Sequence, residues 1–450
     1  NTMIVSGDLP DFITIDWNDN AVQQMIEGGL VLPLDELAEK YDPYFFTVAD
    51  PYKLEWYRED DGHIYQYPNA SSSPKDFEQY KDLRPSNQTF LVRKDIYEAI
   101  GSPDMRTPEG FLNALQKAKE MFPEVNGQPL IPLGLHEFTE TGNFSLESYL
   151  QNYLAIPYEK DGKLYDRLTD PEYIRWLKTL RKANEMGLLA EDIFIDKRPQ
   201  MEEKIAQGRY FAMLYQRSDF QVQQLARYAE DPDSIYIAVD GPANSNLDEP
   251  TLAGDSIGGW TVTLISKNVK DPARAIRFLS YLISEEGNKD LYFGKEGVTY
   301  EVVDGKPQFK EEVLELLQTD RNAFDQKYGA SYKYWMLMDT NLELKWKPEP
   351  AEPLKVLEDW TRGKTIDVSA YLGLDPKGNT EEGIAFNKIQ QEWGKTLPRL
   401  LLAESDEEFD KIFNEFLEKR EELGYDIVQE YRQKQFEENL EKIQRAKEGE

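Results

Sequence analysis

The stretch "GGWTVTLISKNVKDPARAIRFLSYLISEEG" (residues 258–287) decides the class of fold that the sequence predicts. Apolar residues alternate at Val262 and Leu264, with Trp260 in phase, which is typical of a β-strand. Asp271 and Pro272 then mark the start of a helix. A strand that leads directly into a helix is the repeating unit of an α/β protein.

The same alternation recurs along most of the chain. Strands are predicted at Leu9–Ile15, Leu130–Leu135 and Tyr210–Leu214. Helices of about 10–20 residues lie between them, and the one that begins at Thr107-Pro108 has both a cap residue and a first-turn proline. We therefore expect α/β lobes with mainly parallel sheets.

The pattern changes after about Val302, where helices and polar links replace the strands. Between Ser405 and Lys442 apolar residues recur at helical spacing, which predicts helices that pack one face on a lobe. The last stretch, "RQKQFEENLEKIQRAKEGE", predicts a frayed helix.

Length and composition limit the classes of function. The chain has 450 residues, which is too many for one ordinary core, so two or more lobes are expected. Mean hydropathy is −0.67, and we find no apolar run near the ~18 residues that a membrane helix needs. A net charge of −32 repels phosphate backbones and anionic lipid, so no nucleic-acid partner is expected.

The sequence offers little for a metal or a cofactor. It contains no cysteine and only two histidines, His63 and His136, so no metal site and no cofactor are expected. The segment Leu374–Gly383 collects acidic side chains, but Lys377 replaces an oxygen ligand of the calcium-loop pattern. Nucleotide-binding glycine loops and the nucleophile-elbow motif are missing from the sequence.

Aromatic residues are the informative excess, at 12% of the chain. Most aromatic side chains form core, but rings flanked by Asp, Asn and Arg are better candidates for a binding surface. The segment Asp16-Trp17-Asn18-Asp19 is one such place, because a large ring stands among three small polar groups at the end of a predicted strand.

Several motifs resemble those of the extracellular solute-binding proteins of ABC sugar importers. "SGDLPDFITIDW" (residues 6–17) is similar to an early signature of that family, and "FLVRKDIYEAIGSPDMRTPEGFLNAL" (residues 90–115) to a later one. The best match is residues 258–308, which include "FGKEGVTYEVVDGKPQ". This last motif is typical of the larger lipoprotein-type members from Gram-positive bacteria, which serve oligosaccharide uptake. The resemblance covers about residues 3–310, and the helical tail also looks like that subgroup.

The resemblance implies a periplasmic-binding-protein-like fold: two α/β lobes with a hinge and a ligand cleft, plus C-terminal helices. Lobe 1 is expected at 1–87 and 260–299, and lobe 2 at 88–259 and 300–450. The chain should cross between lobes near Ser86–Thr89, Gly258–Trp260 and Gly297–Tyr300. The family normally has a strand, a helix and a second strand before residue 6, so lobe 1 is expected to lack them here. A lipidated cysteine would lie upstream.

The resemblance also implies the site, because ligands of such sheets lie beyond the carboxyl ends of strands. Sugars need rings for their C–H faces and planar polar groups for their hydroxyls. The expected ligand-binding residues are Asp16, Trp17, Asn18, Asp19, Asn69, Asn87, His136, Glu137, Arg217, Asp219, Asp255, Trp260 and Trp335. Each has a structural alternative: Trp17 as a cap on the core, Arg217 as an ion-pair partner of Asp219, and Trp335 as a packing residue.

The implied function is the substrate-binding component of an ABC importer. It would bind an oligosaccharide by hinge closure, act as a cell-surface lipoprotein monomer, and deliver the sugar to membrane permease subunits. No catalytic residues are expected. Two alternatives remain open, a peptide-binding transport protein of the same fold and a glycoside hydrolase. A hydrolase would need two carboxyl groups at a fixed separation, and no residue pattern marks such a pair.

Overall fold

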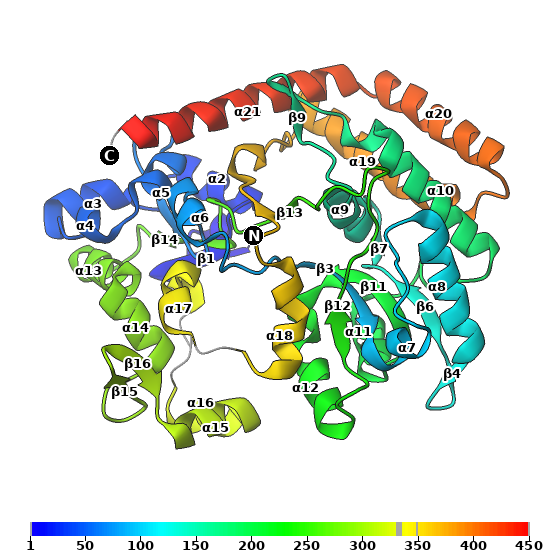
Figure 1. Ribbon diagram of the computed structural model, residues 1–450. Helices are drawn as coiled ribbons and strands as arrows, with labels where there is room; N and C mark the ends of the chain where they lie inside the picture. The colour runs from blue at the N-terminus through cyan, green and yellow to red at the C-terminus, as the bar shows by residue number, and fades with distance from the viewer. Residues whose placement is uncertain (1, 330–334, 348–349, 449–450) are drawn as a thin grey trace.

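Two separate β-sheets organise the chain into two α/β lobes that lie side by side (Figure 1). The computed structural model describes residues 2–329, 335–347 and 350–448. In the first lobe, β1 (Phe12–Asp16), β14 (Thr261–Ile265) and β2 (Gln66–Pro68) lie in the order β1-β14-β2. In the second lobe the order is β12 (Tyr236–Ala238), β3 (Gln88–Arg93), β11 (Tyr210–Gln216) and β6 (Ile131–Gly134).

The expectation of mainly parallel sheets is wrong. The central strand β14 runs antiparallel to both of its neighbours, and so does β3 in the second lobe. Within these two sheets only β11 and β6 pair in parallel. Both β14 and β3 begin directly after a segment that crosses from the other lobe, so each enters its sheet from the opposite end to its neighbours.

The apolar alternation of the opening stretch places side chains on both faces of the first sheet. Val262 and Leu264 pack on one face with Val22, while Ile265 packs on the other face with Ile276. The helices of this lobe are α1 (Thr2–Ser6), α2 (Asn20–Glu27), α3 (Leu34–Tyr41), α4 (Phe45–Val48), α5 (Pro51–Trp56), α6 (Pro74–Tyr80), α13 (Pro272–Ile283) and α14 (Glu285–Phe293).

The second sheet is also buried on both faces. Along β11, Phe211 and Leu214 join the larger core, and Met213 and Tyr215 join a smaller core on the opposite face. The covering helices are α7 (Lys94–Ala99), α8 (Pro108–Met121), η1 (Ser145–Leu150), α9 (Gln151–Tyr153), α10 (Pro171–Glu185), α11 (Arg198–Ala206) and α12 (Gln221–Glu230). Short hairpins join β4 (Glu124–Val125) to β5 (Gln128–Pro129), β7 (Phe138–Thr139) to β8 (Gly142–Asn143), and β9 (Glu159–Lys160) to β10 (Lys163–Leu164).

Crossing segments lie side by side between the lobes. β13 (Leu252–Ala253) pairs in parallel with β17 (Thr365–Ile366). Ser86 contacts β13, because its hydroxyl donates to the carbonyl of Ala253 at 2.9 Å. Its backbone N–H donates to Thr361 Oγ1, also at 2.9 Å. The single-turn helices η2 (Arg167–Thr169), η3 (Arg217–Phe220), η5 (Asp359–Thr361) and η6 (Ser369–Tyr371) occur in the connections.

The predicted crossing near Gly297–Tyr300 is not where the chain reaches the second lobe. β15 (Tyr300–Val303) and β16 (Lys306–Phe309) form a hairpin against α14, where the rings of Phe293 and Phe309 lie 4.8 Å apart. Helices α15 (Glu311–Thr319), α16 (Arg321–Lys327), η4 (Trp335–Leu337) and α17 (Thr340–Trp346) follow. Contact with the second sheet resumes at α18 (Glu352–Glu358), which packs on β12 and α12. Aromatic packing on α14 thus keeps the hairpin with the first lobe.

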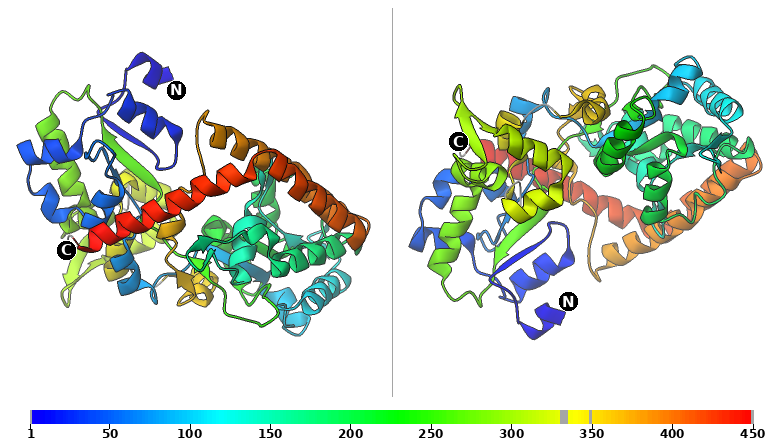
Figure 2. Two further views of the ribbon diagram at one scale, coloured as in Figure 1. Left: turned by 90° about the horizontal axis from the view of Figure 1, so that it is seen from above. Right: turned by 90° about the horizontal axis from the view of Figure 1, so that it is seen from below.

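The last helix contacts both lobes. α19 (Glu381–Leu402) and α20 (Asp406–Glu422) pack on the second lobe, and α21 (Tyr425–Glu448) then runs across to α5 (Figures 1 and 2). Ala446 is buried in the core of the first lobe, and Arg445 pairs with Glu55 at 2.8 Å. The expectation of a frayed end is therefore wrong, because tertiary contacts hold the helix.

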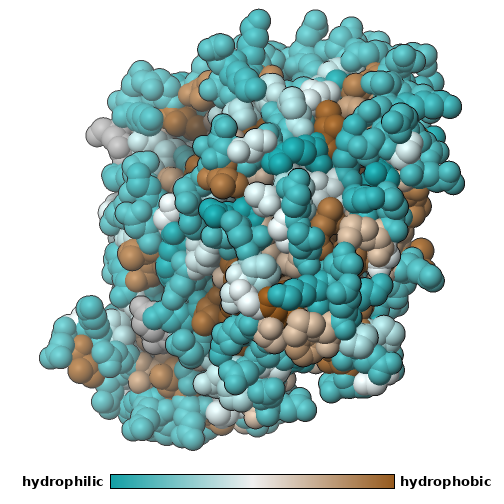
Figure 3. Space-filling model, turned by 45° about the vertical axis from the view of Figure 1, so that its right-hand side comes forward, coloured by the Kyte–Doolittle hydropathy of each residue, from teal (hydrophilic) through white to brown (hydrophobic). Residues whose placement is uncertain are grey.

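The surface agrees with the high net charge. Figure 3 shows a face that is mostly hydrophilic, with small, scattered hydrophobic patches. Among the described residues, the search for a helix with the length and apolar character needed to span a membrane finds none.

Candidate functional site

One edge of the first sheet carries Trp17, Trp260 and Asn69 side by side. The Trp17 N–H donates to the carbonyl of Trp260 at 3.5 Å, and the Trp260 N–H donates to the carbonyl of Asn69 at 3.1 Å. This edge is formed by the carboxyl ends of β1 and β2 and the start of β14, next to the crossing segment Ile257–Gly259. The Trp260 side chain is 52% exposed, which is unusual for an indole.

Trp17 is held in a fixed position at this edge. A methyl group added at Gly258 would lie 3.1 Å from its ring, and one at Gly373 would lie 3.4 Å from it. The ammonium group of Lys377 lies 5.9 Å from the ring centre and donates to the carbonyl of Asn18 at 2.9 Å. Trp17 therefore packs on the core with part of its ring and leaves part at the surface.

The acidic neighbours of Trp17 are exposed but shape the local backbone. One oxygen of Asp16 accepts the N–H of Asn18 at 2.8 Å. Asp19 caps α2 by accepting the N–H of Ala21 at 2.8 Å. Each carboxylate retains a second oxygen that these two bonds do not use, and carboxylate oxygens accept hydroxyl donors well.

Asn69 differs from the prediction. Its side chain is buried, and its Oδ1 accepts the N–H of Thr261 at 2.8 Å. The amide oxygen therefore holds β2 to the start of β14, which places Trp260 at the edge. We assign Asn69 a positioning role, because its burial leaves little surface for a ligand.

One edge of the second sheet collects five more of the predicted residues. His136 and Glu137 follow β6, Arg217 and Asp219 follow β11, and Asn87 precedes the antiparallel strand β3. The chain order of these strands brings residues from three distant segments to one place. The N–H groups of Arg217 and Ser218 donate to the backbone and side-chain oxygens of Asn87 at 3.0 and 3.1 Å.

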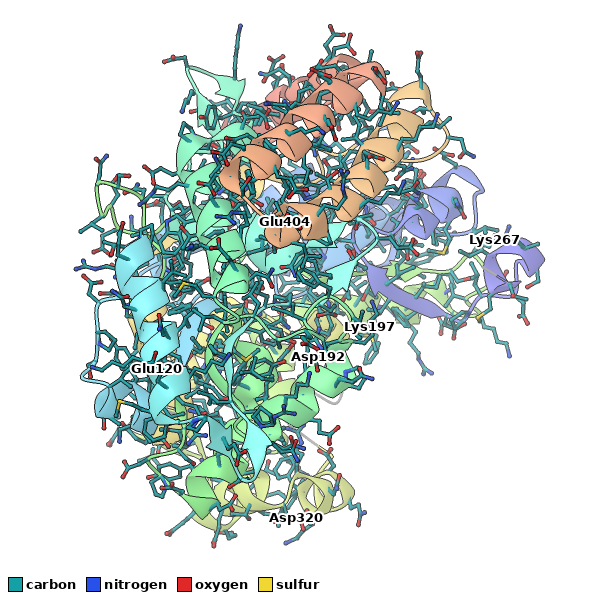
Figure 4. The ribbon with its side chains drawn as sticks, turned by 90° about the vertical axis from the view of Figure 1, so that its right-hand side faces the viewer. Glu120, Asp192, Lys197, Lys267, Asp320 and Glu404 are labelled. Carbon is teal, nitrogen blue, oxygen red and sulfur yellow. The ribbon has the colours of Figure 1, made fainter. Side chains whose placement is uncertain are left out.

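His136 is the centre of a buried polar cluster. Its ring stacks on Tyr215, with centroids 4.1 Å apart and planes at 27°. Its Nδ1 lies 3.7 Å from an Oε2 of Glu137. Asp219 forms an ion pair with Arg198, the first residue of α11. The adjacent Lys197, labelled near Asp192 in Figure 4, donates from its Nζ to the carbonyl of Phe138 at 3.2 Å.

Four buried atoms of this cluster lack hydrogen-bond partners among the described residues. They are His136 Nε2, Glu137 Oε2, Tyr215 OH and Asp219 Oδ2, although the last lies in the ion pair with Arg198. Buried polar atoms normally have partners, and an unpaired one costs about 1–3 kcal/mol. Several of them lie in this one cluster around His136.

Burial also fixes the charge states in the cluster. It lowers the pKa of His136 to about 4; the positive charge of Arg198 adds to this, and Glu137 opposes it. Burial raises the pKa of Tyr215 to about 12. His136 is therefore a neutral imidazole at physiological pH, able to donate one hydrogen bond and accept another.

The structural alternative for Arg217 was an ion pair with Asp219, but the Arg217 side chain binds other groups. Its Nε donates to the carbonyl of Ser86 at 2.8 Å, and its Nη1 lies 3.5 Å from Glu358 of α18. Burial lowers the pKa of Arg217. The side chain therefore ties the end of β11 to a crossing segment and to α18.

Asp255 lies in a crossing segment between the two edges. It accepts a hydrogen bond from Arg84 at 3.2 Å and one from the hydroxyl of Thr340 at 3.3 Å, and about half of its side chain is exposed. Trp335, the last predicted residue, has its backbone in η4, and its side chain lies outside the described residues.

The structure thus groups the predicted residues on two edges and one crossing segment, and adds Tyr215, Arg198 and Lys377. Tyr215 could have been included, since it directly follows the predicted strand Tyr210–Leu214. Arg198 and Lys377 come from distant segments, and no local pattern marks them.

The described residues contain no group of three or more His, Cys, Asp or Glu placed to hold a metal ion. In the segment Leu374–Gly383, which was compared above with the calcium-loop pattern, Asp375 pairs with Arg432 and Thr380 caps α19.

Residues 1–289 match the family model described as bacterial extracellular solute-binding protein. No curated protein sequence matches the chain significantly. A solved extracellular solute-binding protein from Bifidobacterium longum subsp. infantis is 17% identical, with a TM-score of 0.69 over 98% of this chain and 89% of that one.

Two further solved structures have the same fold. A human-milk-oligosaccharide ("HMO") binding solute-binding protein from Bifidobacterium longum infantis has a TM-score of 0.66 at 16% identity, over 97% of this chain and 89% of its own. The FusA substrate-binding protein of S. pneumoniae, solved with kestose, has a TM-score of 0.65 at 17% identity over the same shares. At these identities the likeness establishes the periplasmic-binding-protein-like fold.

Proposed function

Because the chain belongs to the family of bacterial extracellular solute-binding proteins, we propose that it is the substrate-binding component of an ABC importer for an oligosaccharide. The ligand binds between the two lobes. The observation that carries this proposal is the contrast between the two sheet edges. One presents the rings of Trp17 and Trp260, and the other presents buried polar atoms without partners, such as those of His136 and Glu137.

This contrast suits the chemistry of a sugar. The C–H face of a pyranose packs on indole rings, while its hydroxyls donate to and accept from carboxylate, imidazole and phenol groups. A neutral His136 fits this role because it both donates and accepts without adding charge. The oligosaccharides named for the similar structures, a milk oligosaccharide and kestose, support the same class of ligand.

Ligand binding is proposed to close the two lobes. A ligand that contacts both edges binds the closed form more tightly than the open form, and it shifts the population by that difference in affinity. The crossing segments around Ser86 and Ala253 are the hinge in this proposal, since the chain passes between the lobes there and a hydrogen bond joins the two segments. The closed form is then recognised by membrane permease subunits.

The family and the similar structures are binding proteins, and the family description places its members outside the cytoplasmic membrane. We propose further that this chain is a monomer without catalytic activity, anchored at the cell surface by an N-terminal lipid. Incubation with the bound oligosaccharide, followed by product analysis, tests the absence of hydrolysis.

A thermal-shift panel tests the proposal itself. Neutral and acidic oligosaccharides of two to six units are compared with peptides of similar mass. Stabilisation by one class of oligosaccharide supports the proposal, because a ligand at 100 times its Kd adds about 2.7 kcal/mol of stability. Stabilisation by peptides alone would favour a peptide-binding protein of the same fold.

A further inference from the structure

A second cavity, of about 260 Å³, lies between the C-terminal helices and the second lobe. Its walls come from η1, α9, the connection Tyr165–Leu168, and one face each of α19, α20 and α21. It shares no lining residue with either sheet edge of the proposed oligosaccharide site. Figure 1 shows α19, α20 and α21 along the top of the molecule, away from β12.

Arg167 lines this cavity without an ion-pair partner. Its Nη2 donates to Asn152 at 2.6 Å and its guanidinium group stacks on Tyr158 at 4.0 Å, but its Nε is buried without a hydrogen-bond partner. No carboxylate of the described residues lies within 4 Å of it. Burial accordingly lowers the pKa of Arg167. A half-buried guanidinium group without an ion-pair partner among the described residues is unusual in a chain with a net charge of −32.

Arg420 contributes a second guanidinium group and is only 7% exposed. Its Nη2 donates to Asp166 at 2.7 Å, and the group stacks on Tyr425 at 3.9 Å. Its Nε has no hydrogen-bond partner among the described residues and lies 3.7 Å from a carboxylate oxygen of the exposed Glu421. The Nε–H groups of Arg167 and Arg420 are thus both without a hydrogen-bond partner, and both residues line the cavity.

The remaining walls supply amides and rings. Gln151, Gln390 and Gln429 line the cavity, as do Phe386 and Trp393. A third arginine, Arg432, also lines it and pairs with Asp375, which lies outside the lining. Cationic, amide and aromatic groups together match a small molecule that has a carboxylate, hydroxyls and an apolar face.

Glu147 is the one lining carboxylate besides Asp166. Its Oε1 accepts from the indole of Trp393 at 2.6 Å and from the N–H of Asn143 at 2.8 Å. Burial raises its pKa to about 7, so the group is about half protonated at neutral pH. With Glu147 protonated, Asp166 is the one charged lining carboxylate and faces three lining arginines, of which Arg432 and Arg420 also have Asp375 and Glu421 as ion-pair partners.

We propose that this cavity is a second ligand site, which binds a hydroxylated carboxylate of about monosaccharide size, such as a sugar acid. A volume of about 260 Å³ accommodates a ligand of this size. The guanidinium groups of Arg167 and Arg420 bind the carboxylate, the glutamine amides bind hydroxyls, and the ring of Phe386 or Trp393 covers the C–H face. The site is independent of the interlobe site proposed above.

Calorimetric titration of the full chain tests this site, with D-glucuronate as the probe and D-glucose as the neutral control. Glucuronate should bind with a Kd of about 1 mM or tighter, and glucose at least about tenfold more weakly. Arg432→Gln should weaken glucuronate binding about tenfold. Arg399→Gln is the matched control, because it removes the same charge from an exposed position on α19 and should change nothing.

Two further variants separate the outcomes. Trp260→Ala should leave glucuronate binding unchanged, and its loss in that variant would place the ligand in the interlobe site and overturn the proposal. Equal affinity for glucose and glucuronate, or full affinity in Arg432→Gln, would also overturn it.

The affinity for glucuronate should fall from pH 6 to pH 8 as Glu147 ionises, and Glu147→Gln should remove this dependence. The other titratable groups that line the cavity are Tyr165, Asp166, Arg167, Arg420, Tyr425 and Arg432.

Discussion

The backbone N–H of Trp17 donates to the carbonyl oxygen of Trp260 at 3.5 Å, although the two residues stand far apart in the sequence. This bond extends the antiparallel pairing of β1 with β14 beyond Asp16 and Thr261. It places two indole side chains on one sheet edge, next to the crossing segments. The proposed oligosaccharide site depends on this pairing.

Removing the exposed indole should separate binding from stability. Trp260 is 52% exposed, so Trp260→Ala should change the free energy of unfolding by less than about 1 kcal/mol. The oligosaccharide Kd should rise about tenfold or more, because stacking and burial of the ring are lost. Titration calorimetry and chemical denaturation measure the two effects.

Tyr44→Ala is the matched control, since Tyr44 is an equally exposed ring at 51%, next to α4. It should leave the affinity unchanged. An equal loss of affinity in both variants, or none in Trp260→Ala, would remove Trp260 from the site.

The two histidines should titrate far apart. Burial lowers the pKa of His136 to about 4, whereas the hydrogen bond from His63 to Asp35 raises the pKa of His63 above 6.5. Since the chain has only these two histidines, their imidazole NMR signals can be followed individually from pH 3 to pH 9. A signal from His136 that titrates near pH 6.5 would show that its ring is solvated, which contradicts the stacked, buried geometry.

The depressed pKa of His136 also predicts a pH dependence of stability. Between pH 6.5 and about 4 the unfolded chain binds a proton at this residue and the folded chain does not, so stability is lost as the pH falls through that window. The full effect is about 3 kcal/mol. The difference in unfolding free energy between wild type and His136→Gln isolates it, and a difference independent of pH from 7 to 4 would refute the assignment.

Gly259 should tolerate no side chain. Its φ is +68°, and an added Cβ would lie 2.2 Å from the carbonyl oxygen of Asn69. Gly259→Ala should therefore destabilise the protein by about 3 kcal/mol or more, from backbone strain and from the clash. Gly62→Ala is the control, because Gly62 has a φ of +87° but open space around it, and it should cost only about 1 kcal/mol. Equal melting temperatures for both variants would contradict the close approach.

The contact of α21 with the first lobe should hold the end of that helix. Ala446→Asp buries a charge among Val22, Trp56 and their neighbours, so the last turns should detach from α5. Hydrogen exchange of residues 436–448 should become faster by about tenfold or more. Gln444→Asp, on the exposed face of the same helix, should leave exchange unchanged, and fast exchange already in the wild type would contradict the packing.

The sequence predicts local elements well where one strand or one helix carries its own pattern. The alternation of Val262 and Leu264 and the Asp271-Pro272 start signal are confirmed in β14 and α13. Strand direction was not predictable, because pairing depends on where each strand enters its sheet. The ordered C-terminal end of α21 was not predicted either, because it also depends on contacts with a distant segment. Polar side chains of its last turns bind Glu55 and the carbonyl of Trp56 in the first lobe.

The candidate site shows the same limit. Residues that directly follow a strand, such as Trp17 and His136, can be predicted from the strand itself, because the strand end determines their position. Arg198 and Lys377 reach the same edges from a helix start and a loop that lie far away in the sequence. The burial of Asn69, which decides whether its amide faces a ligand or the backbone, has no local sequence signal.

The most direct test of the central claim is a thermal-shift measurement of the wild-type chain against oligosaccharides and peptides, repeated with Trp17→Ala and Trp260→Ala. We predict a rise of several degrees in Tm with one class of oligosaccharide, lost in both variants, and no rise with peptides. A rise with peptides alone, or an oligosaccharide response that survives both substitutions, would contradict the interlobe sugar site. No response to any oligosaccharide at 10 mM would contradict oligosaccharide binding itself.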